Sequence, residues 1–566
     1  MNHQPFTPSL ASLTRERFSV SLKHAMDVAR TRLLVATAIF SFGILIIGGR
    51  LFELTVIRHG EEPSIAEQDL TSGLRTGRAD IIDRQGQILA TTITTSSLYA
   101  NAKQIINAEE AAQKLLTILP NLNVKDILKR LQSDRPFIWI ARHLTPVQRH
   151  EILRLGIPGL SFMRDQRRIY PHGHLVAHVL GYTDIDNRGI AGIEKGMDSV
   201  LSSQNEPLQL SLDLRFQHIV RDEVLKGMEE FGAVGGCGAI MDIRTGEIIA
   251  MSSLPDYDPN HPTQATEDQL FNKVTLGTYE VGSIMKVANT GLALESGVAT
   301  LATKFDASHP LKVGRFPITD FKGKNRWLNL AEVFVYSSNI GSAKIALAAG
   351  AEKQQAFLKK LGYLDPPPSF ELPEVGAPLV PKRWREATMI TVSYGYGLSV
   401  SPIQTMLGIM TLAGGGERKK PTLILNRAGI PKGEQVISRN ISRTLLQLMR
   451  YVVTAGTSRK ANIPGYYIFA KSGTANLRVG RHYQTDRVMA NFVAVLGKAM
   501  DDPRYVIYVM LDDPKRLQKT YGYNTAGWNA APVGGRIIAR MAPMMGFVPF
   551  EHESEPLDPF FRNVKF

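Results

Sequence analysis

The chain has 566 residues, 44% hydrophobic and 21% charged, which is typical of globular protein and predicts roughly two to four folded units. Its single cysteine, Cys237, excludes an intrachain disulfide and a multi-cysteine metal site, and its apolar surroundings predict a small buried residue. The net charge of +14 suits a lipid headgroup, a cell-wall polymer or nucleic acid. Because the basic residues are scattered, without a long Lys/Arg run, we expect no nucleic-acid binding.

An apolar run without charges occupies residues 33–49 and continues after Arg50, reaching the ~20 residues that cross a bilayer. Basic residues outnumber acidic ones before this run, which predicts that residues 1–32 stay in the cytoplasm. A signal peptide and a buried core helix are the alternatives; the preceding tail is long for a signal peptide, and no A-x-A site closes the run. We therefore expect a single-pass anchor over 33–57, with nearly everything after it outside the cytoplasm.

Residues 58–205 are predicted to form a mixed domain that precedes the main folded unit. Two extended apolar runs within 79–92 flank a polar turn at 83–86, which is a hairpin signal. The spacing of apolar residues predicts helices over 109–119 and 124–131.

Three histidines, His172, His174 and His178, lie close together near the end of this domain. His174 and His178 would lie one turn apart on a helix and resemble part of a metal site. No cysteine or carboxylate completes the set nearby, so we expect structural or solvated histidines and no bound metal.

A second unit is predicted over 206–550, followed by a C-terminal tail over 551–566. Residues 238–260 indicate two strands around a turn at 244–246, and three further strands are indicated much later, within 466–476, 491–497 and 505–513. Helical stretches lie between the early and late strands. The pattern predicts an α+β fold, in which an antiparallel sheet of sequence-distant strands has a helical subdomain packed on one side.

The stretch "YEVGSIMKV" places Ser283 and Lys286 three positions apart at the start of a predicted helix. Residues three apart on a helix are neighbours, so the lysine ammonium group can reach the serine hydroxyl. A buried lysine can lose its proton near neutral pH, and a helix N-terminus favours developing negative charge. The pair could therefore form a serine nucleophile with its own base, although such a short motif also occurs as the polar start of an ordinary helix.

Two further polar clusters follow in the chain. "VYSSNIGSAK" places Ser337 and Asn339 at the head of another predicted helix, and "AKSGTA" supplies four residues of a predicted strand. Taken alone, each cluster is explained by helix capping or by the end of a strand. In the order S-x-x-K, S-x-N, K-[ST]-G, the three clusters are the signature of penicillin-recognising serine enzymes. The strand residues of the third cluster are Lys471, Ser472, Gly473 and Thr474.

On these motifs the chain resembles the class B penicillin-binding proteins, membrane-anchored peptidoglycan transpeptidases, and is most similar to the division-specific (septal) type. The resemblance covers nearly the whole chain: "GRADIIDRQGQILA", "RRIYPHGHLVAHVLGYTD" and "GIAGIEKGMD" resemble the non-catalytic pedestal domain, and "SYGYGLSVSPIQ" resembles a landmark of the transpeptidase domain. Val281 stands where many members have proline, and Ser472 replaces the commoner threonine. Residues 526–538, "AGWNAAPVGGRII", depart further from the family pattern.

The resemblance implies a catalytic role for five side chains. Ser283 would attack the D-Ala-D-Ala amide carbonyl and form an acyl-enzyme, and Lys286 would be its base. Ser337 would relay a proton to the departing amine, Asn339 would hold the donor peptide and Lys286, and Lys471 would support the proton network electrostatically.

The same resemblance implies how the substrate is held. The hydroxyls of Ser472 and Thr474 would bind the terminal carboxylate, and Gly473 would let the substrate backbone lie against the strand edge. The backbone N–H groups of Ser283 and Thr474 would form an oxyanion hole, in which one donor is commonly worth ~3–4 kcal/mol. No metal or organic cofactor is implied.

The partners implied are peptidoglycan stem peptides as donor and amine acceptor, β-lactams, the inner membrane, a membrane-embedded lipid II polymerase and other divisome proteins. The implied location is the inner membrane at the division septum, with the catalytic domain in the periplasm.

An elongation-specific class B enzyme is the nearest alternative. A serine β-lactamase needs neither anchor nor pedestal, a class A enzyme needs a glycosyltransferase domain, and a β-lactam sensor normally has several spans. A non-catalytic scaffold is disfavoured because all three motifs are intact.

Overall fold

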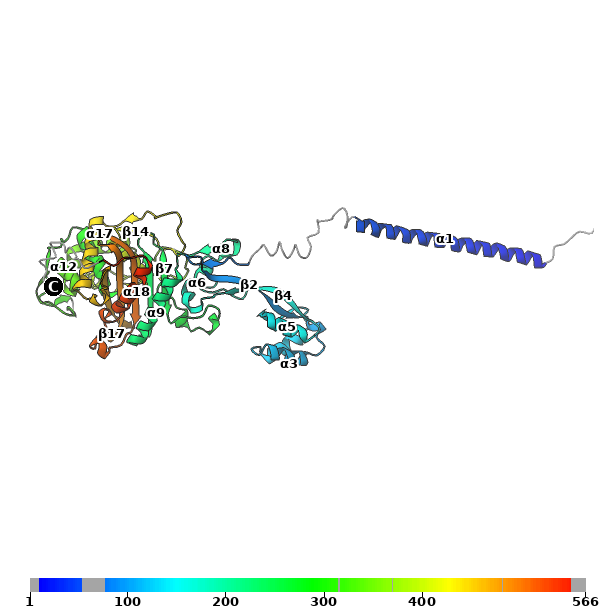
Figure 1. Ribbon diagram of the computed structural model, residues 1–566, viewed down its shortest axis with the longest axis horizontal. Coiled ribbons are helices and arrows are strands. Elements are labelled where there is room, and N and C mark those ends of the chain that lie inside the picture. Colours follow the sequence, from blue (N-terminus) through cyan, green and yellow to red (C-terminus); the bar gives the residue numbers. More distant parts are fainter. Residues whose placement is uncertain (1–9, 53–76, 314–315, 369, 481, 551–566) are drawn as a thin grey trace, which may run out of the picture. The chain divides into compact units, whose positions relative to one another are not determined.

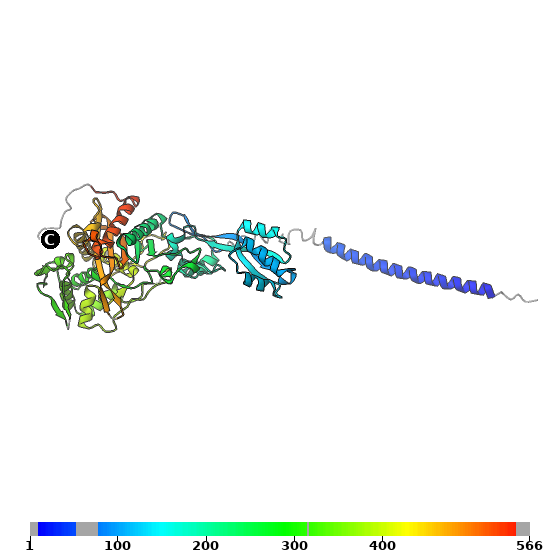
Figure 2. The ribbon, with the colours of Figure 1, turned by 90° about the horizontal axis from the view of Figure 1, so that it is seen from below.

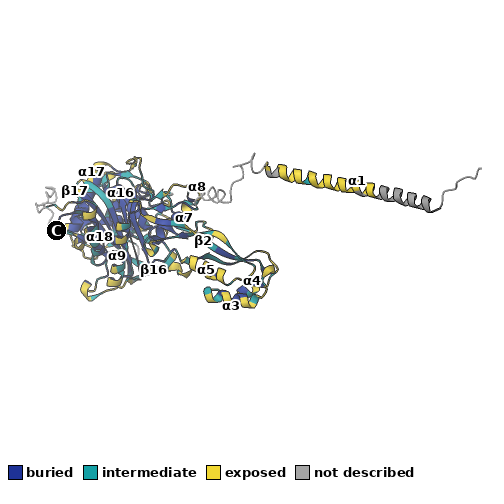
Figure 3. Ribbon diagram, turned by 45° about the vertical axis from the view of Figure 1, so that its right-hand side comes forward, coloured by how far each residue is buried: buried dark blue, intermediate teal, exposed yellow. Residues whose placement is uncertain are grey.

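The computed structural model describes residues 10–52, 77–313, 316–368, 370–480 and 482–550, in two compact units, 1–76 and 77–566. In the first unit, one helix, α1 (Leu10–Phe52), begins well before the predicted anchor. Its segment Met26–Gly49, with a mean hydropathy of 2.0, is long and apolar enough to cross a membrane, and nearly all of its described residues are exposed (Figure 3). The last residues of the predicted anchor and the predicted tail 551–566 lie outside the described residues.

The pedestal is built on a five-stranded sheet. Strand β2 (Ile88–Ala100) pairs antiparallel with β1, β3 and β4, and β1 pairs parallel with β5. The predicted hairpin at 83–86 is confirmed: the Asp83 carboxylate accepts hydrogen bonds from the backbone N–H groups of Gln85 and Gln87, at 2.8 and 2.9 Å. The other strands are β1 (Ile81–Ile82), β3 (Ile138–Leu144), β4 (Leu160–Ile169) and β5 (Leu208–Gln209).

Three helices pack at one end of this sheet and enclose a small core of their own with β2 and β3 (Figure 1). The first two confirm the predicted helices over 109–119 and 124–131, and each begins at an asparagine whose side chain accepts two backbone N–H bonds, Asn107 and Asn123. These helices are α3 (Ala108–Ile118), α4 (Val124–Leu131) and α5 (Pro146–Arg154).

Short helices lead from this sheet toward the predicted second unit: η3 (Gly173–Val176), α6 (Ala177–Leu180), α7 (Gly192–Gly196) and α8 (Asp198–Ser203). The fully buried Glu194 of α7 binds the guanidinium groups of Arg78 and Arg168, so a buried ion cluster ties the first residues of the pedestal to its last helices. The carboxylate of Asp198 binds Arg78 as well, at 2.6 Å. Breaking such a buried cluster by removing one partner is strongly destabilising, by about 3–5 kcal/mol.

The three histidines of this region do not converge. His178 is buried with its Nε2 atom 2.7 Å from the carbonyl oxygen of Gln269, and burial lowers its pKa to about 4. His174 is half-exposed and lies 3.4 Å from the carboxylate of Asp256. Within the described residues, no group of three or more His, Cys, Asp or Glu side chains is placed to hold a metal ion.

The predicted unit over 206–550 is centred on a five-stranded antiparallel sheet of order β16-β17-β18-β6-β7, which confirms the predicted α+β arrangement of sequence-distant strands. Helices α9 (Leu214–Phe231) and α18 (Ala530–Met544) cover one face, where they share a core with alternate residues of the strands. The strands are β6 (Gly235–Asp242), β7 (Ile248–Leu254), β16 (Tyr467–Val479), β17 (His482–Ala499) and β18 (Asp502–Asp512).

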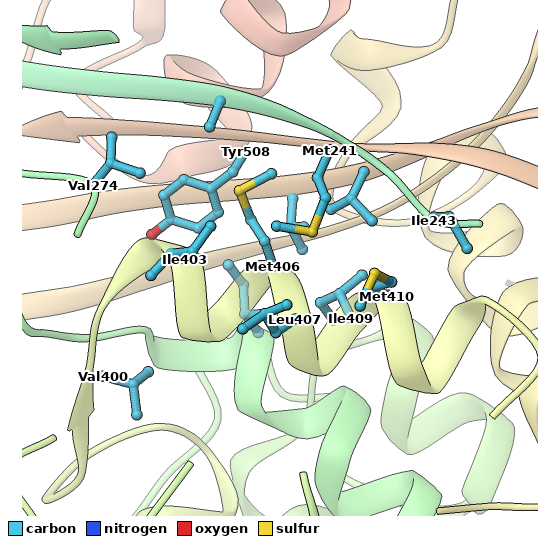
Figure 4. Packing of buried hydrophobic residues seen from close by; sticks show 14 of the residues in the cluster. Met241, Ile243, Val274, Val400, Ile403, Met406, Leu407, Ile409, Met410 and Tyr508 are labelled. Atoms are coloured by element: carbon cyan, nitrogen blue, oxygen red, sulfur yellow. The ribbon is translucent and has the colours of Figure 1, made fainter. Parts of the chain in front are cut away.

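The helical subdomain between β7 and β16 covers the other face (Figure 2). Its central helix, α16 (Pro402–Ala413), is buried along its whole length, and Met406 and Met410 pack toward Tyr508 of β18 and Met241 of β6 (Figure 4). Cys237 is fully buried in this core, as predicted. The remaining helices are α10 (Glu267–Leu270), α11 (Met285–Glu295), α12 (Leu330–Val335), α13 (Asn339–Ala349), α14 (Ala351–Lys360), α15 (Glu386–Ser393) and α17 (Arg439–Thr454).

Small two-stranded ladders complete the subdomain. One of them, β8 (Tyr279–Glu280) with β13 (Ser399–Val400), leads directly into the Ser283 turn. The others are β9 (Lys304–Asp306) with β12 (Trp327–Asn329), β10 (Leu311–Val313) with β11 (Phe316–Ile318), and β14 (Glu417–Arg418) with β15 (Glu434–Gln435).

Candidate active site

Ser283 lies on a 3₁₀ turn, η5 (Gly282–Ile284), that runs directly into α11. The residue before it, Gly282, has a φ of +56°, and a Cβ atom there would lie 2.5 Å from the carbonyl oxygen of Thr474. Only glycine tolerates both this backbone conformation and this close approach. The turn therefore presses Ser283 against strand β16.

The Lys286 side chain is almost completely buried, 1% exposed, and its Nζ atom contacts three residues. It lies 3.0 Å from Oγ of Ser283 and 2.7 Å from Oδ1 of Asn339. It also lies 2.6 Å from the carbonyl oxygen of Ser337 and 3.2 Å from the hydroxyl of that residue. One amine thus joins the serine of the first motif to both polar residues of the second.

Ser337 and Asn339 are held in place by the start of helix α13. Ser337 has a φ of +58°, unusual for a residue with a side chain, and this conformation directs both its carbonyl oxygen and its hydroxyl toward Lys286. Ser338 caps the helix, its hydroxyl accepting the N–H of Gly341 at 2.9 Å. Such strained backbone persists only where the surroundings hold it, which is common at active sites.

Lys471 approaches the same point from the sheet. Its Nζ atom lies 3.1 Å from the Ser337 hydroxyl and 3.0 Å from the carbonyl oxygen of Ser472, and the side chain is fully buried. The Ser337 hydroxyl is therefore placed between two buried amines, those of Lys286 and Lys471. The structure brings together all five side chains that the sequence motifs singled out as catalytic.

Burial sets the charge of both amines. Desolvation lowers the pKa of Lys286 well below its ordinary value, the nearby Lys471 charge lowers it further, and Asp320 opposes the shift. Desolvation alone lowers the pKa of Lys471 to about 7. A lysine whose pKa is lowered is a neutral amine at a pH where an exposed lysine is charged, and a neutral amine can accept a proton from a serine hydroxyl.

The three residues that follow Lys471 have different surroundings. The Ser472 hydroxyl lies 3.0 Å from that of Thr457, and the Thr474 hydroxyl accepts a hydrogen bond from the N–H of Ala526 at 3.0 Å. At Gly473 a Cβ atom would lie 2.1 Å from the carbonyl oxygen of Val281. Glycine is thus required here because the segment before Ser283 packs against the strand, a reason that differs from the predicted room for a substrate backbone.

Asp320 is a site residue that the sequence patterns did not indicate. Its carboxylate accepts the hydroxyl of Ser338 at 2.7 Å and the N–H groups of Asn339 and Ile340 at 2.6 and 3.0 Å. It thereby fixes the start of α13 and, through it, the side chains that bind Lys286. A lone aspartate far upstream in a loop carries no periodic or spacing signal, so only the fold reveals it.

Glu280, three residues before the nucleophile, is engaged elsewhere. Its carboxylate accepts the N–H of Gly397 at 2.7 Å and the hydroxyl of Tyr483 at 2.8 Å, and burial raises its pKa. Both bonds run toward the loop before β13 and toward the β16–β17 hairpin. Glu280 therefore joins these segments to the strand that leads to Ser283.

Comparison with known proteins gives the same fold and domain order. Residues 236–539 match the family model described as the penicillin binding protein transpeptidase domain, and residues 74–215 match the penicillin-binding protein dimerisation domain. The probable peptidoglycan D,D-transpeptidase FtsI of Caulobacter vibrioides is 33% identical, covering 93% of this chain and 92% of that protein. The peptidoglycan D,D-transpeptidase FtsI of Escherichia coli K12 is 28% identical, covering 87% of each.

Among solved structures, penicillin binding protein 3 from Mycobacterium tuberculosis, complexed with aztreonam, shares the fold with a TM-score of 0.65 and 23% identity. The similarity covers 84% of this chain and 98% of that one. The transpeptidase model spans more than half of this chain, and the FtsI relative is similar along nearly all of it. The chain therefore belongs to the penicillin-binding protein family, as a class B member with a pedestal and a transpeptidase domain.

Proposed function

We propose that this protein crosslinks peptidoglycan as a D,D-transpeptidase through an acyl-enzyme on Ser283. The observation that carries the proposal is the position of Lys286: a buried amine with a lowered pKa, 3.0 Å from the Ser283 hydroxyl and bonded to Ser337 and Asn339. The peptidoglycan D,D-transpeptidases of Caulobacter vibrioides and Escherichia coli supply the reaction class.

In acylation, the Ser283 hydroxyl gives its proton to Lys286 while its oxygen bonds to the carbonyl carbon of the penultimate D-alanine. The backbone N–H groups of Ser283 and Thr474 stabilise the resulting oxyanion. The proton then passes from Lys286 through the Ser337 hydroxyl to the departing amine, the C–N bond breaks and D-alanine leaves. Lys471, on the other side of Ser337, favours this transfer with its positive charge, while Ser472 and Thr474 bind the terminal carboxylate.

In the second half of the reaction, the amine of a neighbouring stem peptide attacks the ester carbonyl. It loses a proton to the same network, the ester C–O bond breaks, and the Ser283 oxygen recovers a proton. A β-lactam enters by the first half alone: Ser283 opens the lactam ring, and the amine stays tethered to the acyl group. The tethered amine prevents the acceptor from replacing it, so the adduct blocks the enzyme.

The same proposal assigns the protein to the inner membrane at the division septum, with its catalytic domain in the periplasm. Helix α1 supports a membrane anchor, and the similarity to the FtsI proteins is compatible with the septal type. A membrane-embedded lipid II polymerase and other divisome proteins are the proposed partners. A fluorescent fusion is expected to gather at midcell during constriction, whereas even labelling of the side wall would favour the elongation type.

A fluorescent penicillin tests the chemistry directly. Membranes containing the wild type should show one covalent adduct on a denaturing gel, and Ser283→Ala should show none. Ser296→Ala is the matched control, because Ser296 lies at the other end of α11, where its hydroxyl donates a hydrogen bond to the carbonyl oxygen of Leu292. Undiminished labelling of Ser283→Ala would exclude the assignment.

The lifetime of that adduct separates a transpeptidase from a β-lactamase. Class A β-lactamases hydrolyse the acyl-serine ester with a dedicated glutamate and a bound water. In this chain the nearby carboxylate of Glu280 is engaged by Gly397 and Tyr483. The adduct should therefore persist for many minutes with excess drug largely intact, and rapid turnover of penicillin would contradict the transpeptidase proposal.

A further inference from the structure

Two loops and a short helix bring aromatic rings and lysines together near the proposed active site. We call this cluster the aromatic–lysine platform; it consists of Phe321, Lys322, Lys460, Tyr523 and Trp528. Nζ of Lys322 lies 4.9 Å from the ring centroid of Tyr523, and Nζ of Lys460 lies 4.4 Å from that of Trp528. The Tyr523 and Trp528 rings stack with centroids 5.7 Å apart, and Phe321 meets Tyr523 edge-on at 6.3 Å.

The platform carries two exposed positive charges. Both lysines are exposed, and Phe321 is 72% exposed. Within the part of the chain that the structure describes, neither ammonium group has a carboxylate within 4.0 Å, in contrast to Lys344 and Lys515, which pair with aspartates. A cation over an aromatic face keeps its full charge while the ring holds it in position. The platform thus offers fixed cations and flat apolar faces to a ligand.

Both loops of the platform are attached to the proposed catalytic groups. The carboxylate of Asp320, which directly precedes Phe321, accepts a hydrogen bond from the backbone N–H of Asn339. On the other side, the 3₁₀ turn η8 (Ala526–Trp528) contains Ala526, whose N–H binds the Thr474 hydroxyl. The platform therefore adjoins the second and third motifs at once.

Thr457 and Lys324 extend these attachments. A Cβ atom at Gly527 would lie 2.5 Å from the carbonyl oxygen of Thr457, and the Thr457 hydroxyl lies 3.0 Å from that of Ser472. Lys324, in the same loop as Lys322, places its Nζ atom 4.3 Å from the ring centroid of Tyr336, the residue before Ser337. These contacts link the platform to Ser472 and place Lys324 beside the residue that precedes Ser337.

We propose that the aromatic–lysine platform is a subsite for the acceptor stem peptide, an inference that rests on the transpeptidase function proposed above. The acceptor amine attacks the same carbonyl carbon that released D-alanine, so it approaches from the side vacated by that leaving group. The proposed contacts of the leaving group, Ser472 and Thr474, are the ones that the platform adjoins. A stem peptide carries free carboxylates beside its amine, which complement the two lysines, and its backbone can lie on the aromatic rings.

The test uses the full-length protein in detergent and a D-alanyl thioester donor, which acylates Ser283 and releases a thiol. Transfer to two amines is compared: a tetrapeptide stem with free carboxylates, and D-alaninamide, which has none. In the double variant Lys322→Ala, Lys460→Ala, we expect the KM for the tetrapeptide to rise about fivefold, the size expected for two exposed ion pairs. The KM for D-alaninamide should change less than about twofold, and the double Lys→Arg variant should restore tetrapeptide binding.

Lys519→Ala is the matched control, because Nζ of Lys519 also lies over a ring, 5.0 Å from the centroid of Phe231, which belongs to helix α9 and not to the platform. A thermal melting curve of each variant shows that it is folded. An unchanged tetrapeptide KM in the folded double variant would overturn the acceptor subsite, as would an equal loss with both amines. Failure of the proposed function has a different signature: the wild type would form no acyl-enzyme on Ser283 with donor or penicillin.

Discussion

The most informative residues are two lysines that the protein buries beside one hydroxyl. Burying an ammonium group costs several kcal/mol unless it is fully paired, and a lysine under such pressure gives up its proton instead. Lys286 and Lys471 share the Ser337 hydroxyl, so a charge on either one opposes a charge on the other. This arrangement places a buried amine with a lowered pKa beside the nucleophile and a second buried amine beside the same hydroxyl, without a histidine.

The pH dependence of acylation should report this pair. Because Lys286 must be neutral to accept the Ser283 proton, the rate of penicillin acylation rises with pH through an acidic limb, as the lowered pKa values predict. In Lys471→Met the neighbouring charge is absent, so the pKa of Lys286 rises and the acidic limb moves to higher pH. The plateau should fall about 10- to 100-fold, since a hydrogen bond to a charged group contributes about 1.5–3 kcal/mol.

Stopped-flow acylation between pH 5 and pH 10 measures both effects. Lys519→Met is the control, because Lys519 is an exposed lysine outside the platform that lies over Phe231 and pairs with Glu230. If the acidic limb of the acylation rate lies at the same pH in Lys471→Met as in the wild type, the charge of Lys471 does not affect the pKa of Lys286.

Among single residues, the sequence predicted the site residues that belong to a recognisable motif. It missed the residues that position the site through contacts with distant segments of the chain. Ser283 and Lys286 lie three apart on one helical turn, so their contact could be predicted from spacing alone. Asp320 and Gly282 act through contacts with segments far away in the chain, Asn339 and Thr474. Spacing contains no information about such contacts, because they are set by how helices and strands pack.

Among the elements, the approach of the η5 turn to strand β16 decides whether the nucleophile meets the third motif. Both Gly282 and Gly473 lie at this contact, where a single added methyl group would collide with backbone. Sequence patterns predicted the strand and the helix correctly, because alternation and 3.6-residue spacing are local signals. The contact between them depends on tertiary packing and was not predicted.

Gly473→Ala tests this contact. The new Cβ atom would lie 2.1 Å from the carbonyl oxygen of Val281, so the turn and the strand must separate. We expect a loss of about 1–3 kcal/mol in the free energy of unfolding, as for other overpacked sites, and at least a tenfold slower penicillin acylation. Chemical denaturation and the acylation rate are the two measurements.

Gly480→Ala provides a control of similar stability cost. Gly480 has a φ of +61° and no heavy atom within 4 Å of its Cβ position, so the change carries only backbone strain, about 1–2 kcal/mol. Its acylation rate should equal that of the wild type. Equal acylation rates for Gly473→Ala and the wild type would show that separating the η5 turn from strand β16 does not displace Ser283.

At the scale of the whole molecule, one hydrophobic core crosses the predicted boundary between pedestal and catalytic domain. Ile81 and Leu89 of the pedestal, both fully buried, belong to the same cluster as Met241 of the central sheet and Met410 of α16. Strand β1 also pairs in parallel with β5, on the other side of residue 205. The boundary at residue 205 was predicted from where the strand and helix patterns change along the sequence. Such patterns do not reveal which residues share a core, so this boundary stays a prediction.

Two shortened chains decide whether the pedestal folds as part of one unit with the catalytic domain. A chain that starts at Gly77 keeps the shared core and the ion cluster of Arg78 with Glu194, so it should fold and form the penicillin adduct on Ser283. A chain that starts at residue 206 loses several fully buried aliphatic side chains, each worth about 1.5–3 kcal/mol. That loss approaches the 5–15 kcal/mol that typically separates folded from unfolded protein, so the shorter chain should melt far lower or aggregate.

Thermal melting and penicillin labelling of the two chains provide the comparison. Equal melting temperatures and equal labelling would instead make residue 205 a true domain boundary, across which the catalytic domain needs no support.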